Sequence, residues 1–161
     1  NESEESYFVL RLLCRGSNHL CDDSNENQHV PLWEIPLSIL EGWINKNSSF
    51  VKPLLSSLQL FTTTKENDRI IFEWHPTTLC LLDHCDDSDS IVRSISPNLL
   101  GTFGSTGSRI PYYRRRIDLI KKLDSSNNPI LDEAKDRLVK EGEKYIKREQ
   151  SEEDNYNAYY Q

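Results

Sequence analysis

The side chains best suited to chemistry in this chain of 161 residues are its four cysteines and four histidines. Most of them fall into two groups, which are Cys14, His19 and Cys21, and then His75, Cys80, His84 and Cys85. Thiolate and imidazole are preferred zinc ligands, and Cys80 and His84 lie one helical turn apart, which is the best ligand spacing available. However, the chain has no Cys-x2-Cys pair, and cysteine in an apolar run behaves as a small hydrophobic residue. A zinc site, core positions and a disulfide stay open, and core positions are favoured.

A glycine-rich stretch, residues 101–108 (GTFGSTGS), precedes a predicted helix. Backbone amides ahead of a helix N-terminus can bind a phosphate group. This stretch lacks the Gly-Lys-Ser/Thr of a P-loop, and it follows a helix rather than a strand. A flexible connection between two helices is therefore the simpler interpretation.

One segment concentrates basic and aromatic side chains. It contains Tyr112, Tyr113, Arg114, Arg115 and Arg116, and Lys121 and Lys122 follow. Such a mixture can bind nucleic acid by phosphate contact and stacking. On a helix, however, adjacent arginines point about 100° apart, and Tyr113 shares a core stripe with Ile117 and Ile120. A protein-contact surface at residues 112–116, an ordinary solvated face and a nucleic-acid site stay open.

The formal net charge of −7 belongs to the two ends of the chain. Residues 1–30 hold six acidic and two basic side chains, residues 151–161 hold three acidic and none basic, and residues 31–150 hold seventeen of each. This distribution disfavours nucleic-acid binding overall, although a local patch stays possible.

Other function classes find no support in the sequence. No Ser/His/Asp or Cys/His set is placed by local sequence, so we expect no enzymatic activity and no cofactor. No apolar run approaches the ~20 residues that span a bilayer, and the chain does not begin with the basic-then-apolar pattern that a secretory signal requires. We therefore expect a cytoplasmic protein that does not enter a membrane.

Apolar residues recur every three or four positions, which predicts a mainly helical chain. We expect helices over residues 7–15, 36–44, 50–61, 76–84, 91–99 (kinked at Pro97), 111–123 and 129–150. Residues 16–29 are expected to form a polar loop and residues 151–161 a flexible acidic tail. Residues 69–74 (RIIFEW) have the composition of a strand but no obvious partner, so we expect an extended linker or the start of the next helix.

Two of the predicted helical hairpins repeat at an offset of 38 residues. Leu82 aligns with Ile120, and the turn at Asp86 aligns with the turn at Asp124. An earlier pair over residues 39–50 fits more loosely. A helical hairpin repeated about every 40 residues is typical of HEAT and armadillo arrays, in which neighbouring hairpins must stack to bury their apolar stripes.

Residues 124–138 (DSSNNPILDEAKDRL) resemble the turn and second helix of a HEAT repeat. Residues 107–150 are similar to closing HEAT units at the C-terminal end of large bacterial multidomain proteins, which carry an ATPase or other effector module upstream and are in some cases defence-related. The resemblance covers residues 75–150 and, more weakly, 31–61. It departs at Pro97 and across residues 62–74. It implies an all-α fold, a short α-solenoid of HEAT-like helical hairpins, that binds protein.

The chain begins at Asn1 and contains no methionine, so we expect a fragment or processed segment of a longer protein. Residues 1–161 are expected to form a single helical-repeat domain, with a helix and a polar loop over 1–30 and the hairpins over 31–150. The predicted function is a protein–protein interaction scaffold, the C-terminal interaction or sensor region of a larger protein. A nucleic-acid-binding helical repeat and a small zinc-stabilised domain are the alternatives.

Overall fold

The computed structural model describes Cys14 and residues 30–66, 69–101 and 107–159. Its elements in chain order are η1 (Pro31–Glu34), α2 (Leu37–Ile44), η2 (Ser48–Phe50), α3 (Val51–Ser57), β1 (Phe61–Glu66), β2 (Arg69–Trp74), α4 (Pro76–Asp83), α5 (Ser88–Leu100), α6 (Ile110–Lys121) and α7 (Pro129–Tyr159). Two of them, η1 and η2, are short 3-10 helices. The chain is mainly helical, as predicted, and it also contains a two-stranded sheet.

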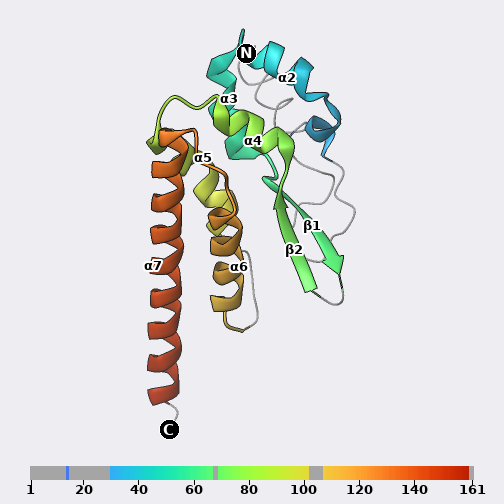
Figure 1. Cartoon of the computed structure of the whole chain (residues 1–161). Coiled ribbons are helices and arrows are strands. Elements are labelled where there is room, and N and C mark those ends of the chain that lie inside the picture. The colour runs from blue at the N-terminus through green and yellow to red at the C-terminus, as the bar shows by residue number, and fades with distance from the viewer. Residues whose placement is uncertain (1–13, 15–29, 67–68, 102–106, 160–161) are drawn as a thin grey trace, which may run out of the picture.

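The helices form two groups, and the sheet lies to one side of them (Figure 1). The long helix α7 packs along α6 and also contacts α5, which in turn packs against α3. The shorter helices α2, α3 and α4 lie together at one end of the molecule, and the hairpin of β1 and β2 extends from them beside α6 (Figure 1). Helix α5 thus connects the two groups, because it contacts α3 on one side and both α6 and α7 on the other.

The segment between α3 and α4 is a β-hairpin, which corrects the prediction for this region. The strands pair antiparallel, with Phe61 opposite Trp74 and Thr64 opposite Ile71. The sequence prediction ended a helix at Phe61 and treated residues 62–68 as a polar connection. The threonines there are polar but β-branched, and branching at Cβ favours an extended backbone. The chain is therefore mainly helical rather than all-α.

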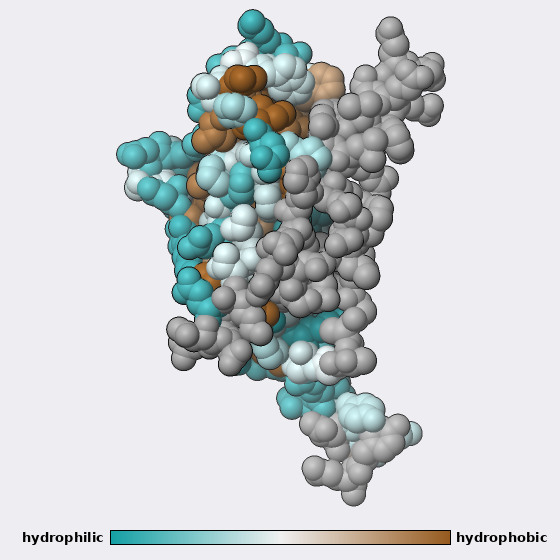
Figure 2. Space-filling view, turned by 90° about the vertical axis from the view of Figure 1, so that its right-hand side faces the viewer, coloured by the Kyte–Doolittle hydropathy of each residue, from teal (hydrophilic) through white to brown (hydrophobic). Residues whose placement is uncertain are grey.

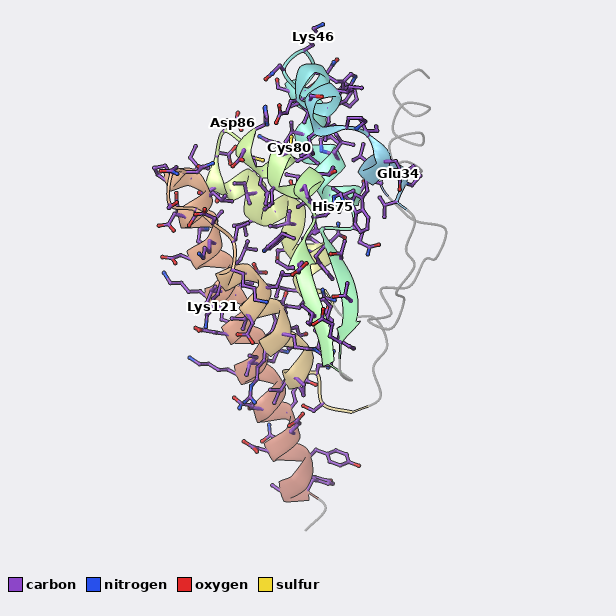
Figure 3. All side chains as sticks on the ribbon, turned by 45° about the vertical axis from the view of Figure 1, so that its right-hand side comes forward. Glu34, Lys46, His75, Cys80, Asp86 and Lys121 are labelled. Atoms are coloured by element: carbon purple, nitrogen blue, oxygen red, sulfur yellow. The ribbon has the colours of Figure 1, made fainter. Side chains whose placement is uncertain are left out.

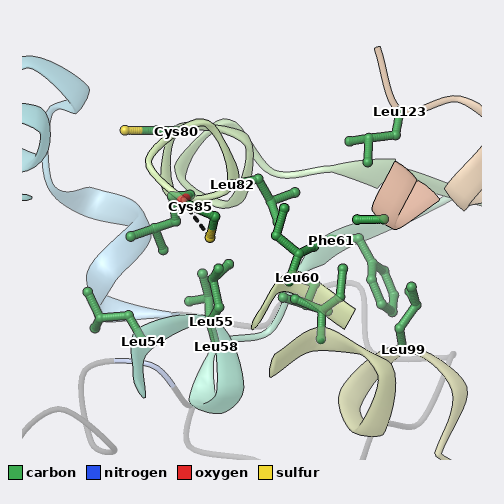
Figure 4. Packing of buried hydrophobic residues seen from close by; sticks show 14 of the residues in the cluster. Leu54, Leu55, Leu58, Leu60, Phe61, Cys80, Leu82, Cys85, Leu99 and Leu123 are labelled. Atoms are coloured by element: carbon green, nitrogen blue, oxygen red, sulfur yellow. Dashed lines mark hydrogen bonds between the residues drawn. The ribbon is translucent and has the colours of Figure 1, made fainter. Parts of the chain in front are cut away.

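Leucine and isoleucine side chains from α3, α4, α5 and the residues after α3 form the centre of the core. Those exposed by no more than 1% include Leu54, Leu55, Leu58, Leu60, Leu81, Leu82, Ile91, Ile95 and Leu99. Figure 4 shows Leu82 of α4 pointing toward Leu60 and Phe61, where the hairpin leaves α3. Burial of each such side chain contributes about 1.5–3 kcal/mol. This core fixes the start of the hairpin against α4 and α5.

Side chains cap the N-termini of three helices. His75 Nδ1 accepts a hydrogen bond from the Thr77 amide at the start of α4, and Asp87 Oδ1 accepts one from the Ser90 amide at the start of α5. Asn128 Oδ1 accepts from the Leu131 amide at the start of α7. Each bond satisfies an amide that the helix itself leaves unpaired. The predicted helix starts near residues 76 and 129 are confirmed.

Helix α7 continues to Tyr159, whereas the sequence prediction ended it near residue 150. Arg109 Nε donates to Glu149 Oε1 at 3.0 Å, which ties the start of α6 to α7. Arg148 Nε donates to Glu152 Oε1 at 2.9 Å, one turn along. Ion pairs between side chains four residues apart stabilise a helix. This pair therefore favours a helical conformation for the acidic segment after residue 150. Among the described helices, none combines the length and the apolar character that crossing a membrane requires.

Part of the sequence prediction lies outside the described residues. This applies to the loop over residues 16–29 with His19 and Cys21, to residues 102–106 of the glycine-rich stretch, and to the helix over residues 7–15 except for one residue. Cys14 is helical and buried, and its carbonyl accepts a hydrogen bond from the Gln59 amide at 3.3 Å.

Candidate protein-binding surface

The predicted contact segment, residues 112–116, lies in the first half of α6, and much of it faces inward. Tyr113 is buried, and its ring stacks on Tyr145 of α7 with centroids 5.3 Å apart. Its expected place in a core stripe is therefore confirmed. Tyr112 is half-buried and donates a hydrogen bond from its hydroxyl to the Gly101 carbonyl at 3.0 Å. Both tyrosines thus hold α6 in place within the chain.

Arg116 is almost completely buried, with 1% of its surface exposed. Its guanidinium carbon lies 4.0 Å from the centroid of the Phe61 ring, 4.6 Å from that of Phe72 and 4.8 Å from that of Tyr112. A cation over an aromatic face is attracted by the negative face of the ring, most strongly where water is excluded. We call these three rings the aromatic cage. The cage joins α6 to both strands of the hairpin.

The remaining two residues of the segment are exposed. Arg114 and Arg115 both face outward from α6, and the guanidinium carbon of Arg115 lies 5.9 Å from the Phe72 ring centroid. The structure therefore does not bring the five predicted residues together on one surface. A partner that contacts this segment directly would meet the two arginines and the edge of Tyr112.

A groove of about 570 Å³ lies between α5 and α7, and the sequence prediction missed it. It is lined by Val92 of α5 and by Arg137, Lys140, Glu141, Lys144, Tyr145 and Arg148 of α7. The four basic residues follow one another at spacings of three and four, so they share one face of the helix. We call them the basic stripe. Val92 and the half-buried Tyr145 provide the apolar part of the groove.

The two ends of the basic stripe are paired within the chain, whereas its centre has no ion-pair partner among the described residues. Arg137 donates from Nη2 to Asp89 and from Nη1 to Ser88 Oγ at 3.2 Å, across the start of the groove. Arg148 is paired with Glu152. Lys140 and Lys144 are exposed and form no ion pair with any residue that the structure describes. The groove therefore presents two ammonium groups in its middle that an acidic ligand can reach.

A signal for this groove was present in the sequence. The spacing of the four basic residues is visible without a structure, as are the acidic residues four positions before some of them. The sequence prediction did not connect these residues with a binding site, because charged residues at helical spacing are usual on an exposed helix face. The sequence alone does not show where α5 lies, because the contact between α5 and α7 joins residues far apart in the chain.

Apolar side chains are also exposed at the other end of the molecule. Leu37, Ile39 and Trp43 of α2 have 39%, 62% and 38% of their surfaces exposed, and Leu79 of α4 has 37%. Figure 2 shows apolar residues gathered near the top of one face, where α2 and α4 lie in Figure 1. A second hollow, of about 500 Å³, lies between β2, α4 and the turn after α6. Its charged lining residues are Glu73, Asp83 and Asp124 with Lys122, so this hollow is mainly acidic.

The cysteines of the described region are core residues that form no disulfide with one another. Cys14, Cys80 and Cys85 are all buried, and Figure 4 shows the sulfur atoms of Cys80 and Cys85 pointing to different sides of α4. Burial and, to a smaller extent, nearby Asp86 raise the pKa of the Cys85 thiol to about 11. The favoured core interpretation is confirmed for these three. A thiol with such a pKa is protonated at neutral pH and is a weak metal ligand.

The histidines of this region contact neighbouring groups of the chain. His84 Nδ1 lies 2.8 Å from the Cys80 carbonyl oxygen, one turn earlier. His75, which Figure 3 shows between β2 and α4, stacks on Trp33 with ring centroids 4.2 Å apart. Burial lowers the pKa of His75, although Glu34 opposes the shift. Within the described part of the chain, no three His, Cys, Asp or Glu side chains are grouped so as to hold a metal ion.

Comparison with protein-family models, with curated protein sequences and with solved structures finds no significant match to this chain. The groove between α5 and α7 is therefore the feature of this chain that bears most directly on its function.

Proposed function

We propose that this chain is a protein-binding module and that the groove between α5 and α7 is its binding site. The observation that carries the proposal is the basic stripe beside the apolar surface of Val92 and Tyr145. The ligand that fits is a short protein segment with acidic residues for the stripe and one or two apolar residues for the groove. Such segments bind grooves between helices by placing apolar anchors at helical spacing.

The charge of the site favours an acidic segment. Lys140 and Lys144 lie in the middle of the groove without an ion-pair partner among the described residues, so binding need not break a pair inside the chain. Glu141 also lines the groove, and it would oppose a ligand of uniformly negative charge. An acidic segment with interspersed apolar or hydroxyl-bearing residues satisfies both features.

Several observations weigh against a nucleic acid in the same groove. Acidic side chains lie at both ends of the stripe, since Glu133 is 4.0 Å from Arg137 and Glu152 pairs with Arg148. The net charge of −7 lowers the attraction of the whole chain for polyanions. Tyr145 already stacks on Tyr113, so one face of its ring is not available to a base. The exposed Arg114 and Arg115 of α6 remain the alternative contact for nucleic acid.

The finer architecture and the biological setting are also proposals. Two features support a HEAT-like stack over residues 75–150: consecutive helices joined by short turns after α4 and after α6, and the packing of α5 against α7. We propose that the stack is the C-terminal interaction or sensor region of a larger cytoplasmic protein, without catalytic activity of its own. A zinc-stabilised domain is the remaining alternative, and loss of thermal stability on adding a chelator would support it.

The test is a binding titration with a fluorescent peptide that alternates acidic and leucine residues. We expect saturable binding that weakens with salt, because exposed charges are screened within about 8–10 Å at physiological ionic strength. The variant Lys140→Glu with Lys144→Glu should weaken binding by at least about tenfold, equivalent to roughly 1.4 kcal/mol. The matched control is Lys46→Glu with Lys121→Glu, which changes the net charge equally at exposed positions outside the groove.

Two results would overturn the proposal. Equal loss of affinity in the groove variant and the control would mean that the peptide responds to net charge and not to the site. Tight, salt-sensitive binding of single-stranded RNA that is lost in Arg114→Ala with Arg115→Ala, and retained in the groove variant, would favour the nucleic-acid alternative.

A further inference from the structure

The C-terminal part of α7 extends beyond the helix that supports it. At the start of α6, Arg109 donates a hydrogen bond to Glu149 of α7 and also lies 4.0 Å from Glu152. Helix α7 continues for seven residues after Glu152, to Tyr159, which corresponds to about 10 Å. Figure 1 shows this end of α7 projecting past α6. We call residues 149–159 the projecting end.

The charge of α7 reverses where the projecting end begins. Residues 137–148 contain five basic and two acidic side chains, whereas residues 149–159 contain four acidic and none basic. Within the projecting end, Asp154 is exposed and forms no ion pair with a residue that the structure describes. Lys140 and Lys144 in the groove and Asp154 near the C-terminus of α7 therefore carry opposite charges, and none of them has an ion-pair partner among the described residues.

This order of charges is unfavourable for an isolated helix. The C-terminus of a helix carries a partial negative charge, so acidic side chains close to it raise the energy of the helix and basic ones lower it. The last turn of α7 contains no basic side chain. A basic partner beside the projecting end would remove this disadvantage.

We infer that the groove binds the projecting end of α7 from a second copy of this chain, with the two α7 helices antiparallel. The inference rests on the proposed function, because it names the acidic segment that the groove takes. Antiparallel alignment places the positive part of each helix against the negative part of the other. The contact is self-complementary, as in a two-fold symmetric dimer, the commonest arrangement of soluble homo-oligomers.

The dimensions of α7 allow this pairing. A two-fold axis that crosses α7 near Glu149 brings Lys144 of each copy opposite the segment over residues 152–154 of the other. The projecting end extends past α6, so it can enter the groove of the second copy beside Val92 and Tyr145. A contact limited to one helix and one groove belongs to the class that buries less than about 1,200 Å², and such contacts are weak. We therefore expect a reversible dimer that dissociates on dilution.

The experiment uses two charge-reversal variants of the full chain and their mixture. The acidic variant is Lys140→Glu with Lys144→Glu, and the basic variant is Glu152→Lys with Asp154→Lys. Sedimentation equilibrium should detect dimers of the wild type at roughly 0.1–1 mM protein, fewer dimers at high salt, and monomers of each variant alone. An equimolar mixture of the two variants should dimerise again, because each acidic site then faces a basic one. The milder Lys144→Gln and Asp154→Asn carry the test if a reversal unfolds α7.

The inference is overturned if the wild type stays monomeric over this concentration range, if either variant alone still dimerises, or if the mixture stays monomeric. Peptide binding is measured separately, at a protein concentration low enough to keep the chain monomeric. Wild type that binds the acidic peptide but does not dimerise would refute the second copy as occupant and leave the proposed function standing. Wild type that does neither would refute both.

Discussion

Two regions of the molecule hold positive charge in opposite ways. On the side of the hairpin, Arg116 is buried in the aromatic cage of Phe61, Phe72 and Tyr112. On the outer face of α7, Lys140 and Lys144 are exposed beside a groove. The buried cation is surrounded by its own chain, so it contributes to folding. The exposed cations have no described ion-pair partner, so they are available for binding.

This difference predicts that the same kind of substitution has opposite consequences in the two regions. Removing a buried, packed cation should cost stability, because it leaves a cavity and exposes the rings around it. Removing an exposed cation should leave stability nearly unchanged and affect association instead.

The largest effect is expected at Arg116. Replacement by alanine removes the side chain that fills the aromatic cage, and we expect the free energy of unfolding to fall by about 3–5 kcal/mol. Arg116→Met keeps most of the volume without the charge and should lose less than half as much, since well-packed apolar groups often replace buried charges at little cost. Urea titration followed by circular dichroism measures both. Arg114→Ala, two positions earlier and exposed, is the control, and a similar loss in it would contradict the contrast.

The second effect concerns the inward face of α7. A Cβ atom added at Gly142 would lie 2.7 Å from Cγ1 of Ile117 and 3.5 Å from Cδ2 of Leu100. Alanine normally stabilises a helix by about 1 kcal/mol over glycine, but overpacking a core costs about 1–3 kcal/mol. We expect Gly142→Ala to destabilise the chain by about 1–2 kcal/mol, measured by thermal unfolding.

The matched control for Gly142 lies on the same helix. Ser151 is exposed and also helical, so Ser151→Ala should leave the chain equally stable or slightly more stable. If alanine stabilised both positions, α7 would not be tightly packed on Ile117 at this point. Substitutions on the inward face of α7 would then affect stability as little as substitutions on its outer face.

The third effect is a dependence on pH in the hairpin region. Burial against Trp33 lowers the pKa of His75 below its ordinary value of 6.5, so protonation favours the unfolded chain. This contribution is complete above about pH 7, and it is lost as the pH falls through 6.5 toward the lower pKa of the folded state. The ring is partly exposed and screened by water, so the change should stay well below about 1.4 kcal/mol.

His75→Gln tests that assignment, because glutamine keeps a side-chain acceptor but does not titrate. The melting temperature of the wild type should fall more steeply between pH 7 and pH 5 than that of the variant. If the melting temperature changed equally with pH in both proteins, the pH dependence would come from groups other than His75.

The sequence predicted the helices of this chain better than its contacts. Pro76 and Pro129 were correctly placed at helix starts because proline is favourable in the first turn. The hairpin was missed because three consecutive threonines are polar in composition but favour strands. No local pattern shows that residues 61–66 and 69–74 pair, because pairing depends on the core that holds the ends of both strands.

For the candidate site, too, the sequence predicted local structure but not the contacts between distant residues. Periodicity placed Tyr113 in the core, and by the same spacing Arg116 lies on that face, three positions later. Charged residues are rarely buried, so the residue type of Arg116 argued against a buried position. The cage that makes burial possible comes from the hairpin, which the prediction lacked. The spacing of the basic stripe is visible in the sequence of α7. The groove beside it, however, exists only because α5, from a distant part of the chain, packs against α7.

The smallest effect on stability is expected where the effect on binding is largest. Lys140→Gln with Lys144→Gln removes both unpaired charges of the basic stripe and keeps side chains of similar helix propensity. We expect the free energy of unfolding to change by less than about 0.5 kcal/mol, as for most exposed substitutions, while affinity for the acidic peptide falls severalfold. Urea titration and the peptide titration on the same protein preparation measure the two quantities. A loss of stability comparable to that of Arg116→Ala would mean that these lysines hold α7 in place, and the groove would then be a consequence of folding with no evident ligand.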